Sequence, residues 1–160
     1  MKVSAIISGK RVETISASAS IHDLDNSLNS HHVGALVVSS DGKKIDGIVS
    51  ERDVVRAMPG KLDQLIGMHV RDIMTVDVHT CTPDSTIAEL MKMMTELRIR
   101  HVPVVDAAGS LISIVSIGDV VKNHMSELDS ERQALKDYVT SANCFRVLLG
   151  MKCLNFTNLE

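Results

Sequence analysis

The stretch Ile48-Val49-Ser50-Glu51-Arg52-Asp53-Val54-Val55 indicates the architecture of the chain, because a second version of it follows later in the sequence. This second version is Ile114-Val115-Ser116-Ile117-Gly118-Asp119-Val120-Val121, in which Asp119 follows Asp53 by 66 positions. The likeness extends upstream at almost the same offset, to residues 20–23 with 86–89 and residues 37–38 with 104–105. Internal similarity at a fixed period is typical of repeat architectures. The chain is therefore predicted to contain two copies of one structural unit.

Each copy predicts the same order of elements, namely strand, helix, strand, strand, helix. Alternating apolar residues indicate the strands. A Ser or Thr followed three residues later by an acid indicates a capping box at the start of the first helix. The expected elements of the first copy are a strand at 12–15, a helix opened by Ser20, strands on either side of the turn at Gly42, and a helix at about 51–58. Those of the second copy are a strand at 78–82, a helix opened by Thr86, strands on either side of Gly109, and a helix at 117–125.

The expected fold class is α/β, of the α+β kind. A unit of roughly 50 to 60 residues cannot bury both faces of a small sheet alone. The two copies are therefore expected to pack sheet to sheet with pseudo-two-fold symmetry. The expected boundaries are 1–73 for the first copy with its linker, 74–125 for the second, 126–140 for an amphipathic C-terminal helix, and 141–160 for a tail without an assigned role.

Two segments outside the copies carry their own signals. Pro59-Gly60 is expected to end a helix, and the linker after it is interpreted as a packed connector because it keeps apolar residues at Leu62, Leu65, Ile66 and Ile73. The C-terminal helix has apolar residues among many charges, which is typical of an amphipathic helix. It is expected to cover the repeats or a partner subunit.

Composition argues against several kinds of function. A net charge of −3 and only 2% aromatic residues disfavour nucleic acid as a partner, because such surfaces are usually basic and stack bases on aromatic rings. No segment has the roughly 18 apolar residues of a membrane span, and the N-terminus lacks the pattern of a signal peptide. A cytoplasmic protein without a membrane partner is expected. Its three cysteines show no C-x-x-C spacing, and the neighbouring His31 and His32 are interpreted as surface residues, so no metal site is expected.

The repeated stretches resemble the CBS-domain family, named after cystathionine β-synthase. The likeness is carried by residues 47–56, 98–105 and 116–122, and it extends over about 12–139. More narrowly, the chain resembles stand-alone bacterial proteins that consist of one tandem CBS pair. The resemblance implies a module that regulates without catalysis and binds AMP, ADP or ATP, with no cofactor required. It also implies a homodimer and, for some members, NAD(H) or S-adenosylmethionine as the ligand.

The resemblance assigns roles to residues at the starts of the second helices. It implies that Asp53 and Asp119 hold the ribose, and that Ser50 and Ser116 contact the sugar or phosphate. Free N–H groups at a helix start also attract anions. The same Ser-x-x-Asp pattern is a capping box, which needs no ligand to explain it. The full set of predicted nucleotide-binding residues is Ser50, Arg52, Asp53, Val33, Gly34, Ala35, Arg100, His101, Pro103, Ser116, Gly118 and Asp119.

Three functions stay open at this point. The first is an adenylate-responsive regulatory module that reports energy charge to a protein partner. The second is a redox sensor that binds NAD(H). The third is a structural interaction module with degenerate clefts, because Ser113 stands where the family usually has Gly, the residue that Gly47 supplies in the first copy. A side chain at position 113 is expected to narrow the second cleft. No activated nucleophile or catalytic triad pattern supports an enzyme.

Overall fold

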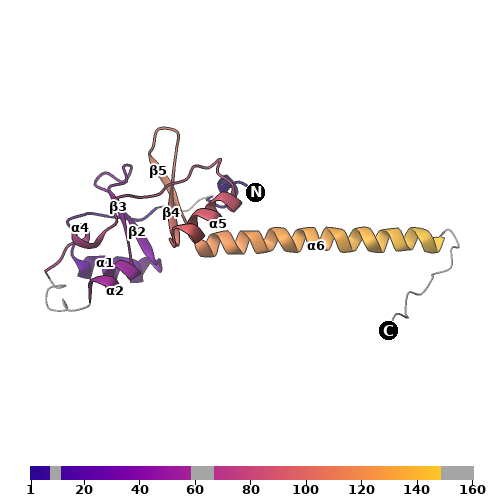
Figure 1. Ribbon diagram of the computed structural model, residues 1–160, viewed down its shortest axis with the longest axis horizontal. Coiled ribbons are helices and arrows are strands. Elements are labelled where there is room, and N and C mark those ends of the chain that lie inside the picture. Colours follow the sequence, from indigo (N-terminus) through magenta and orange to yellow (C-terminus); the bar gives the residue numbers. More distant parts are fainter. Residues whose placement is uncertain (8–11, 59–66, 149–160) are drawn as a thin grey trace. The chain divides into compact units, whose positions relative to one another are not determined.

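A computed structural model describes residues 1–7, 12–58 and 67–148, with side chains described as far as residue 139. The chain divides into two compact units, Met1–Val120 and Val121–Glu160. The first unit contains the strands and the shorter helices of both repeats, and the second contains most of the last helix (Figure 1). The mixed α/β class with two repeats and a C-terminal helix is confirmed.

The first repeat is built on a three-stranded sheet. Strand β1 (Thr14–Ile15) is parallel to β2 (Ala35–Val38), which is antiparallel to β3 (Gly47–Ser50). Helices α1 (Ile21–His31) and α2 (Glu51–Ala57) lie beside each other next to this sheet (Figure 1). Helix α1 begins with the predicted capping box, in which the backbone N–H of Asp23 donates to the Ser20 hydroxyl. The strands and helices of this repeat follow the predicted order.

The second repeat has the same order but a shorter sheet. Helix α5 (Ile87–Glu96) is followed by the antiparallel strands β4 (His101–Val105) and β5 (Leu111–Ser116) and by helix α6 (Ile117–Leu148). The strand expected at 78–82 is reduced to one parallel bridge, between Cys81 and Val104. The N–H of Val105 donates to the Cys81 carbonyl at 2.9 Å, but Pro103, two residues earlier on the same side of β4, has no N–H to donate. The ladder is therefore short.

Unusual backbone angles occur at equivalent positions of both repeats. The residues after the first helices, His32 and Arg98, have φ of +52° and +54°, and the turn glycines Gly42 and Gly109 have φ of +73° and +80°. The left-handed region suits Gly but is uncommon for other residues. Each first helix therefore ends in the same way, which turns the chain directly into a buried strand.

Each repeat completes the core of the other with a short segment. Val3, at the start of the chain, is fully buried in the second repeat's core with Leu90 and Val102. Val70, in helix α4 (Val70–Ile73) of the linker, is fully buried in the first repeat's core with Leu24. The backbone bridges Lys2–Thr86 and Ser20–His69 fix these two exchanges. Residues near the N-terminus therefore pack into the core of the second repeat, although the sequence suggested assigning them to the first.

The linker is packed in the part that the structure describes. Ile73 and Met74 lie against the first repeat's core, as a packed connector requires. Helix α2 ends at Ala57, just before Pro59-Gly60. The apolar positions Leu62, Leu65 and Ile66 lie outside the described residues.

Helix α6 is longer than the sequence suggested. It runs without a break from Ile117 to Leu148, across the boundary expected at 125/126 and into residues assigned to a tail. The sequence has no Gly or Pro between residues 119 and 149, so nothing in it ends the helix there. The second helix of repeat two and the predicted amphipathic helix are therefore one element.

The exchanged segments give a testable prediction about stability. Val3→Asp places an unpaired carboxylate in a fully buried apolar site, so the free energy of unfolding should fall by about 3 kcal/mol or more. Ser4→Asp adds the same charge at the neighbouring exposed position and should change it by less than about 0.5 kcal/mol. Urea denaturation of both variants measures the difference. Equal effects would show that the N-terminal segment does not contribute to the second core.

Candidate functional site

Two clefts border the second helices of the repeats within the first unit. We call them the Asp53 cleft and the Asp119 cleft, after the acid that each contains. Their volumes are about 370 Å3 and 510 Å3, the range of small-molecule sites. The Asp53 cleft is lined by Gly34, Ala35, Ile48, Ser50, Glu51, Arg52, Asp53, Arg56, Thr75, Asp77, Val78, His79, Leu97, Arg98, Ile99, Arg100 and His101. The Asp119 cleft is lined by Val12, Glu13, His31, His32, Val33, Gly34, Ala35, Leu36, His101, Ser113, Ile114, Ser116 and Asp119.

A capping box holds the acid of each cleft at the first turn of its helix. The Asp53 Oδ2 atom accepts from the Ser50 N–H at 2.8 Å and from the Ser50 hydroxyl at 2.6 Å. The Asp119 Oδ2 atom accepts from Ser116 in the same way, at 3.0 Å and 2.6 Å. The capping interpretation of Ser-x-x-Asp is therefore confirmed for both repeats. In each repeat the serine N–H and hydroxyl both bind the Oδ2 atom, so the cap orients a carboxylate that also borders a cleft.

The Asp53 cleft is rich in guanidinium groups. Four arginines line it, namely Arg52, Arg56, Arg98 and Arg100, against the three carboxylates of Glu51, Asp53 and Asp77. The Arg52 Nη1 atom donates to the Arg98 carbonyl at 3.3 Å, which ties helix α2 to the end of α5. A guanidinium presents a planar fork that matches phosphate oxygens. The cleft can therefore pair a carboxylate acceptor with several donors for an anionic group.

The Asp119 cleft has a different electrostatic character. No Lys or Arg is among its described lining residues; its basic groups are His31, His32 and His101. The Nε2 atom of His31 lies 3.9 Å from the Glu13 carboxylate. Both His31 and His32 are exposed, as expected for surface residues. Without a permanent cation, this cleft offers less to a phosphate than the Asp53 cleft.

His101 and Gly34 border both clefts. Burial lowers the pKa of His101 below its usual value, with a further decrease from Arg100, while the carboxylates of Glu51 and Asp119 oppose the shift. A Cβ atom on Gly34 would lie 3.3 Å from the His101 Cε1 atom, a tighter contact than side chains usually make. Because Gly34 has no side chain, the His101 imidazole has room to lie between the two clefts.

Ten of the twelve predicted residues line a cleft. The residues that border only the Asp53 cleft are Ser50, Arg52, Asp53 and Arg100. Those that border only the Asp119 cleft are Val33, Ser116 and Asp119. Both clefts are bordered by Gly34, Ala35 and His101. Pro103 and Gly118 line neither. Pro103 is fully buried within β4, and Gly118 is exposed on the first turn of α6.

Several lining residues were not predicted from the sequence. Arg56 lies one helical turn after Arg52, and this spacing places both side chains on the same side of α2. The spacing could therefore have predicted that Arg56 borders the same cleft as Arg52. Thr75 pairs with Ile48 through an isolated bridge, so only the fold brings it to the cleft. Glu13 likewise reaches the Asp119 cleft from the loop before β1.

Ser113 is the residue expected to narrow the second cleft, and it does line that cleft. It is 99% buried, and its hydroxyl has no hydrogen-bond partner among the described residues. At the equivalent position of the first repeat, a Cβ on Gly47 would lie 2.9 Å from the Met74 Sδ atom and the Thr75 carbonyl. Gly47 is therefore required by close packing.

Among the side chains that the structure describes, in residues 1–7, 12–58 and 67–139, no group of three or more His, Cys, Asp or Glu is placed to hold a metal ion. None of the described helices is long and apolar enough to cross a membrane. Cys81 is a buried free thiol whose pKa is raised to about 11 by burial.

The comparisons with known proteins identify the family. The sequence profile of the CBS domain matches residues 3–60 and 70–126, so this chain belongs to the CBS-domain family and contains a tandem pair. Proteins built on such pairs are generally regulatory modules. The chain is 38% identical over 123 residues to the mitochondrial CBS domain-containing protein CBSX3 of Arabidopsis thaliana, covering 74% of this chain and 59% of CBSX3.

Solved structures of related pairs contain adenosyl ligands. The chain in a crystal structure of CBSX2 in complex with AMP is 28% identical, with a TM-score of 0.67 over 78% of this chain and 96% of that one. The CBS pair of protein MJ0100 in complex with 5-methylthioadenosine and S-adenosyl-L-methionine is 26% identical, with a TM-score of 0.68 over 78% of this chain and 99% of that one.

The buried imidazole predicts a dependence of stability on pH. Because the pKa of His101 is lower in the folded protein than the usual 6.5 or so, the unfolded chain binds the proton more readily. The free energy of unfolding should therefore fall as the pH drops below about 6.5, by up to about 1.4 kcal/mol for each unit by which folding lowers the pKa.

The matched variants are His101→Gln and His22→Gln, the latter at an exposed position of α1. Urea denaturation at pH 7.5 and pH 5.5 should show a smaller loss for His101→Gln than for wild type. His22→Gln should behave like wild type. An undiminished loss in His101→Gln would assign the pH dependence to other groups.

Proposed function

We propose that this chain is a non-catalytic regulatory module that binds AMP in the Asp53 cleft. The observation that carries the proposal is the combination in one cleft of an oriented carboxylate, Asp53, with four arginines. The AMP complex of the related CBSX2 supports the choice of an adenine nucleotide. ADP, ATP and NADH contain the same adenosine phosphate group and are the alternatives to be compared with AMP.

The ribose is proposed to bind at Asp53. A carboxylate accepts hydrogen bonds from both hydroxyls of a vicinal diol, and it does so more strongly than a neutral acceptor. The Ser50 cap fixes this carboxylate before any ligand arrives, so little side-chain entropy is lost on binding. Gly34 and Ala35 are proposed to border the adenine, because they present small surfaces at the same cleft.

The phosphate is proposed to bind among Arg52, Arg98 and Arg100. Charge-assisted hydrogen bonds between guanidinium and phosphate are shorter and stronger than neutral ones. The preference for a single phosphate follows from the balance of charge, because three carboxylates in the same cleft already offset most of the four guanidinium groups. A longer phosphate chain would bring more negative charge to the same carboxylates.

The Asp119 cleft is proposed to favour an adenosyl compound without phosphate. Its described lining has a ribose acceptor in Asp119 but no permanent cation. The complex of MJ0100 with 5-methylthioadenosine and S-adenosyl-L-methionine supports such ligands for related pairs. In this proposal the two clefts bind different adenosine compounds.

Asn substitution separates ligand binding from helix capping. Asp53→Asn keeps an oxygen for the cap but removes the charge, so AMP affinity should fall about tenfold to a hundredfold, equivalent to about 1.5 to 3 kcal/mol. Asp119→Asn is the matched control and should leave AMP affinity within about threefold of wild type. Isothermal titration calorimetry measures both. AMP affinity that is unchanged in Asp53→Asn would show that Ser50-x-x-Asp53 is a helix cap and nothing more.

The phosphate assignment has its own test. Arg100→Ala should reduce the ratio of AMP to adenosine affinity by about tenfold, because one charge-assisted contact is lost while the nucleoside contacts stay. Arg71→Ala removes an exposed arginine that lines neither cleft and should leave the ratio unchanged. Equal weakening of AMP and adenosine by Arg100→Ala would contradict a phosphate contact at this residue.

A further inference from the structure

Helix α6 presents a row of apolar side chains to solvent. From Val121 onward the apolar residues Val121, Met125, Leu128, Leu135 and Val139 fall on alternating steps of four and three, with Arg132 at the one step between Leu128 and Leu135 that is not apolar. The exposed fractions of Leu128 and Leu135 are 47% and 67%. No side chain in the range 121–139 is classed as buried. Such a row over five turns is too long to be explained as scattered surface hydrophobics.

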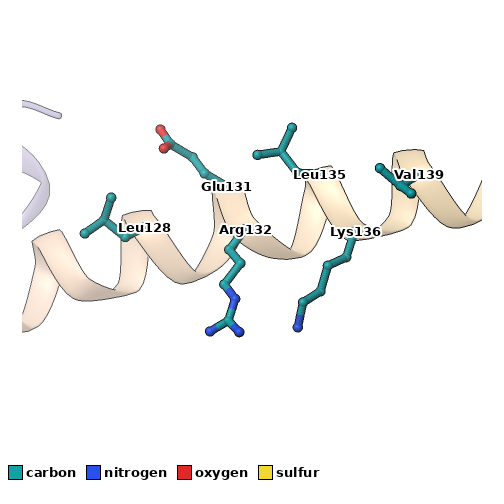
Figure 2. Close-up of a pocket in the computed structure, with 6 residues that line it drawn as sticks. All are labelled: Leu128, Glu131, Arg132, Leu135, Lys136 and Val139. Carbon is teal, nitrogen blue, oxygen red and sulfur yellow. The ribbon is translucent and has the colours of Figure 1, made fainter. Parts of the chain in front are cut away.

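This spacing is the a/d repeat of a coiled coil. Val121, Leu128 and Leu135 take the d positions, and Met125, Arg132 and Val139 take the a positions. Figure 2 shows Leu128, Glu131 and Leu135 on one side of the helix and Arg132 and Lys136 on the other. In the heptad, Glu131 takes a g position and Lys136 an e position, so opposite charges flank the row. A row of apolar residues between opposite charges is the arrangement that a coiled-coil partner covers.

We propose that α6 pairs with α6 of a second copy of the chain as a parallel, in-register, two-stranded coiled coil. The proposal concerns a surface distinct from the clefts and does not depend on the nucleotide. In this arrangement each g residue faces the e residue five positions later on the partner helix. Glu131 then lies opposite Lys136 of the second copy, and twofold symmetry makes this pair twice.

The other flanking and core residues fit the same pairing. In the same register His124 at g faces Asp129 at e of the second copy, with no like charges opposed. Arg132 interrupts the apolar a positions, and a polar a residue is known to fix register and oligomeric state at a cost in stability. In an antiparallel pair g faces g and e faces e, so Glu131 and Lys136 would not meet.

The length of the helix also requires a partner. From Val121 to Leu148 it spans about 42 Å at 1.5 Å per residue. The part of this helix at 121–139 has no buried side chain, so it draws its stability mainly from helix propensity, which is marginal in water. Pairing with a second copy supplies the missing burial for both chains at once.

Cysteine cross-linking of the full-length chain tests the pairing directly. In a background with Cys144→Ser and Cys153→Ser, Leu135→Cys should form a covalent dimer under mild oxidation, because d positions of a parallel pair bring the two Cβ atoms close together. Ser130→Cys lies at the outer f position and is the matched control. We expect at least tenfold more cross-linked dimer from Leu135→Cys than from Ser130→Cys at equal protein concentration.

A charge placed in the row tests the energetics. Leu135→Asp should raise the dissociation constant of the dimer at least a hundredfold in analytical ultracentrifugation, while Ala134→Asp, one residue away on the outer side, should change it by less than threefold. Equal cross-linking of both cysteine variants, no cross-linking of Leu135→Cys, or equal behaviour of the two Asp variants would overturn the proposal. Each of these outcomes would mean that the row is covered by something other than an in-register second copy.

Discussion

The exchange of Val3 and Val70 between the repeats is the constraint on which the rest of the structure depends. Each repeat has too few residues to bury its own sheet, and each receives a fully buried valine from the segment that precedes the other repeat. The exchange holds the two repeats in one compact unit. That unit brings the second helix of one repeat near the end of the first helix of the other, as the contact between Arg52 and Arg98 shows.

The clefts follow from that arrangement, and their differences follow from a few substitutions between equivalent positions. Both clefts have an acid held by a serine cap, but arginines gather only around Asp53. Two repeats with the same sequence pattern therefore offer two different environments. His101 and Gly34 line both clefts. A ligand in one cleft would therefore contact residues that also line the other cleft.

Much of the fold was predictable from the sequence, because it rests on local signals that occur twice. Capping boxes, the turn glycines and the buried strands all follow from short patterns. The strand predicted at 78–82 is reduced to one bridge because Pro103, on the edge of β4 that faces it, has no N–H to donate. Helix α6 is unbroken because no Gly or Pro interrupts it, and the prediction of two helices followed from the expected end of the second repeat. The exchanged valines and the contributions of Thr75 and Glu13 to the clefts arise from packing between distant segments, which no local pattern encodes.

We propose that the Asp53 cleft holds AMP with its ribose on the carboxylate and its phosphate among the arginines. A crystal structure of the protein with AMP tests this most directly. If AMP binds as proposed, both ribose hydroxyls will lie within hydrogen-bond distance of Asp53 and the phosphate beside at least one of Arg52, Arg98 and Arg100. AMP bound with its ribose on Asp119, or with its phosphate away from these arginines, would contradict it.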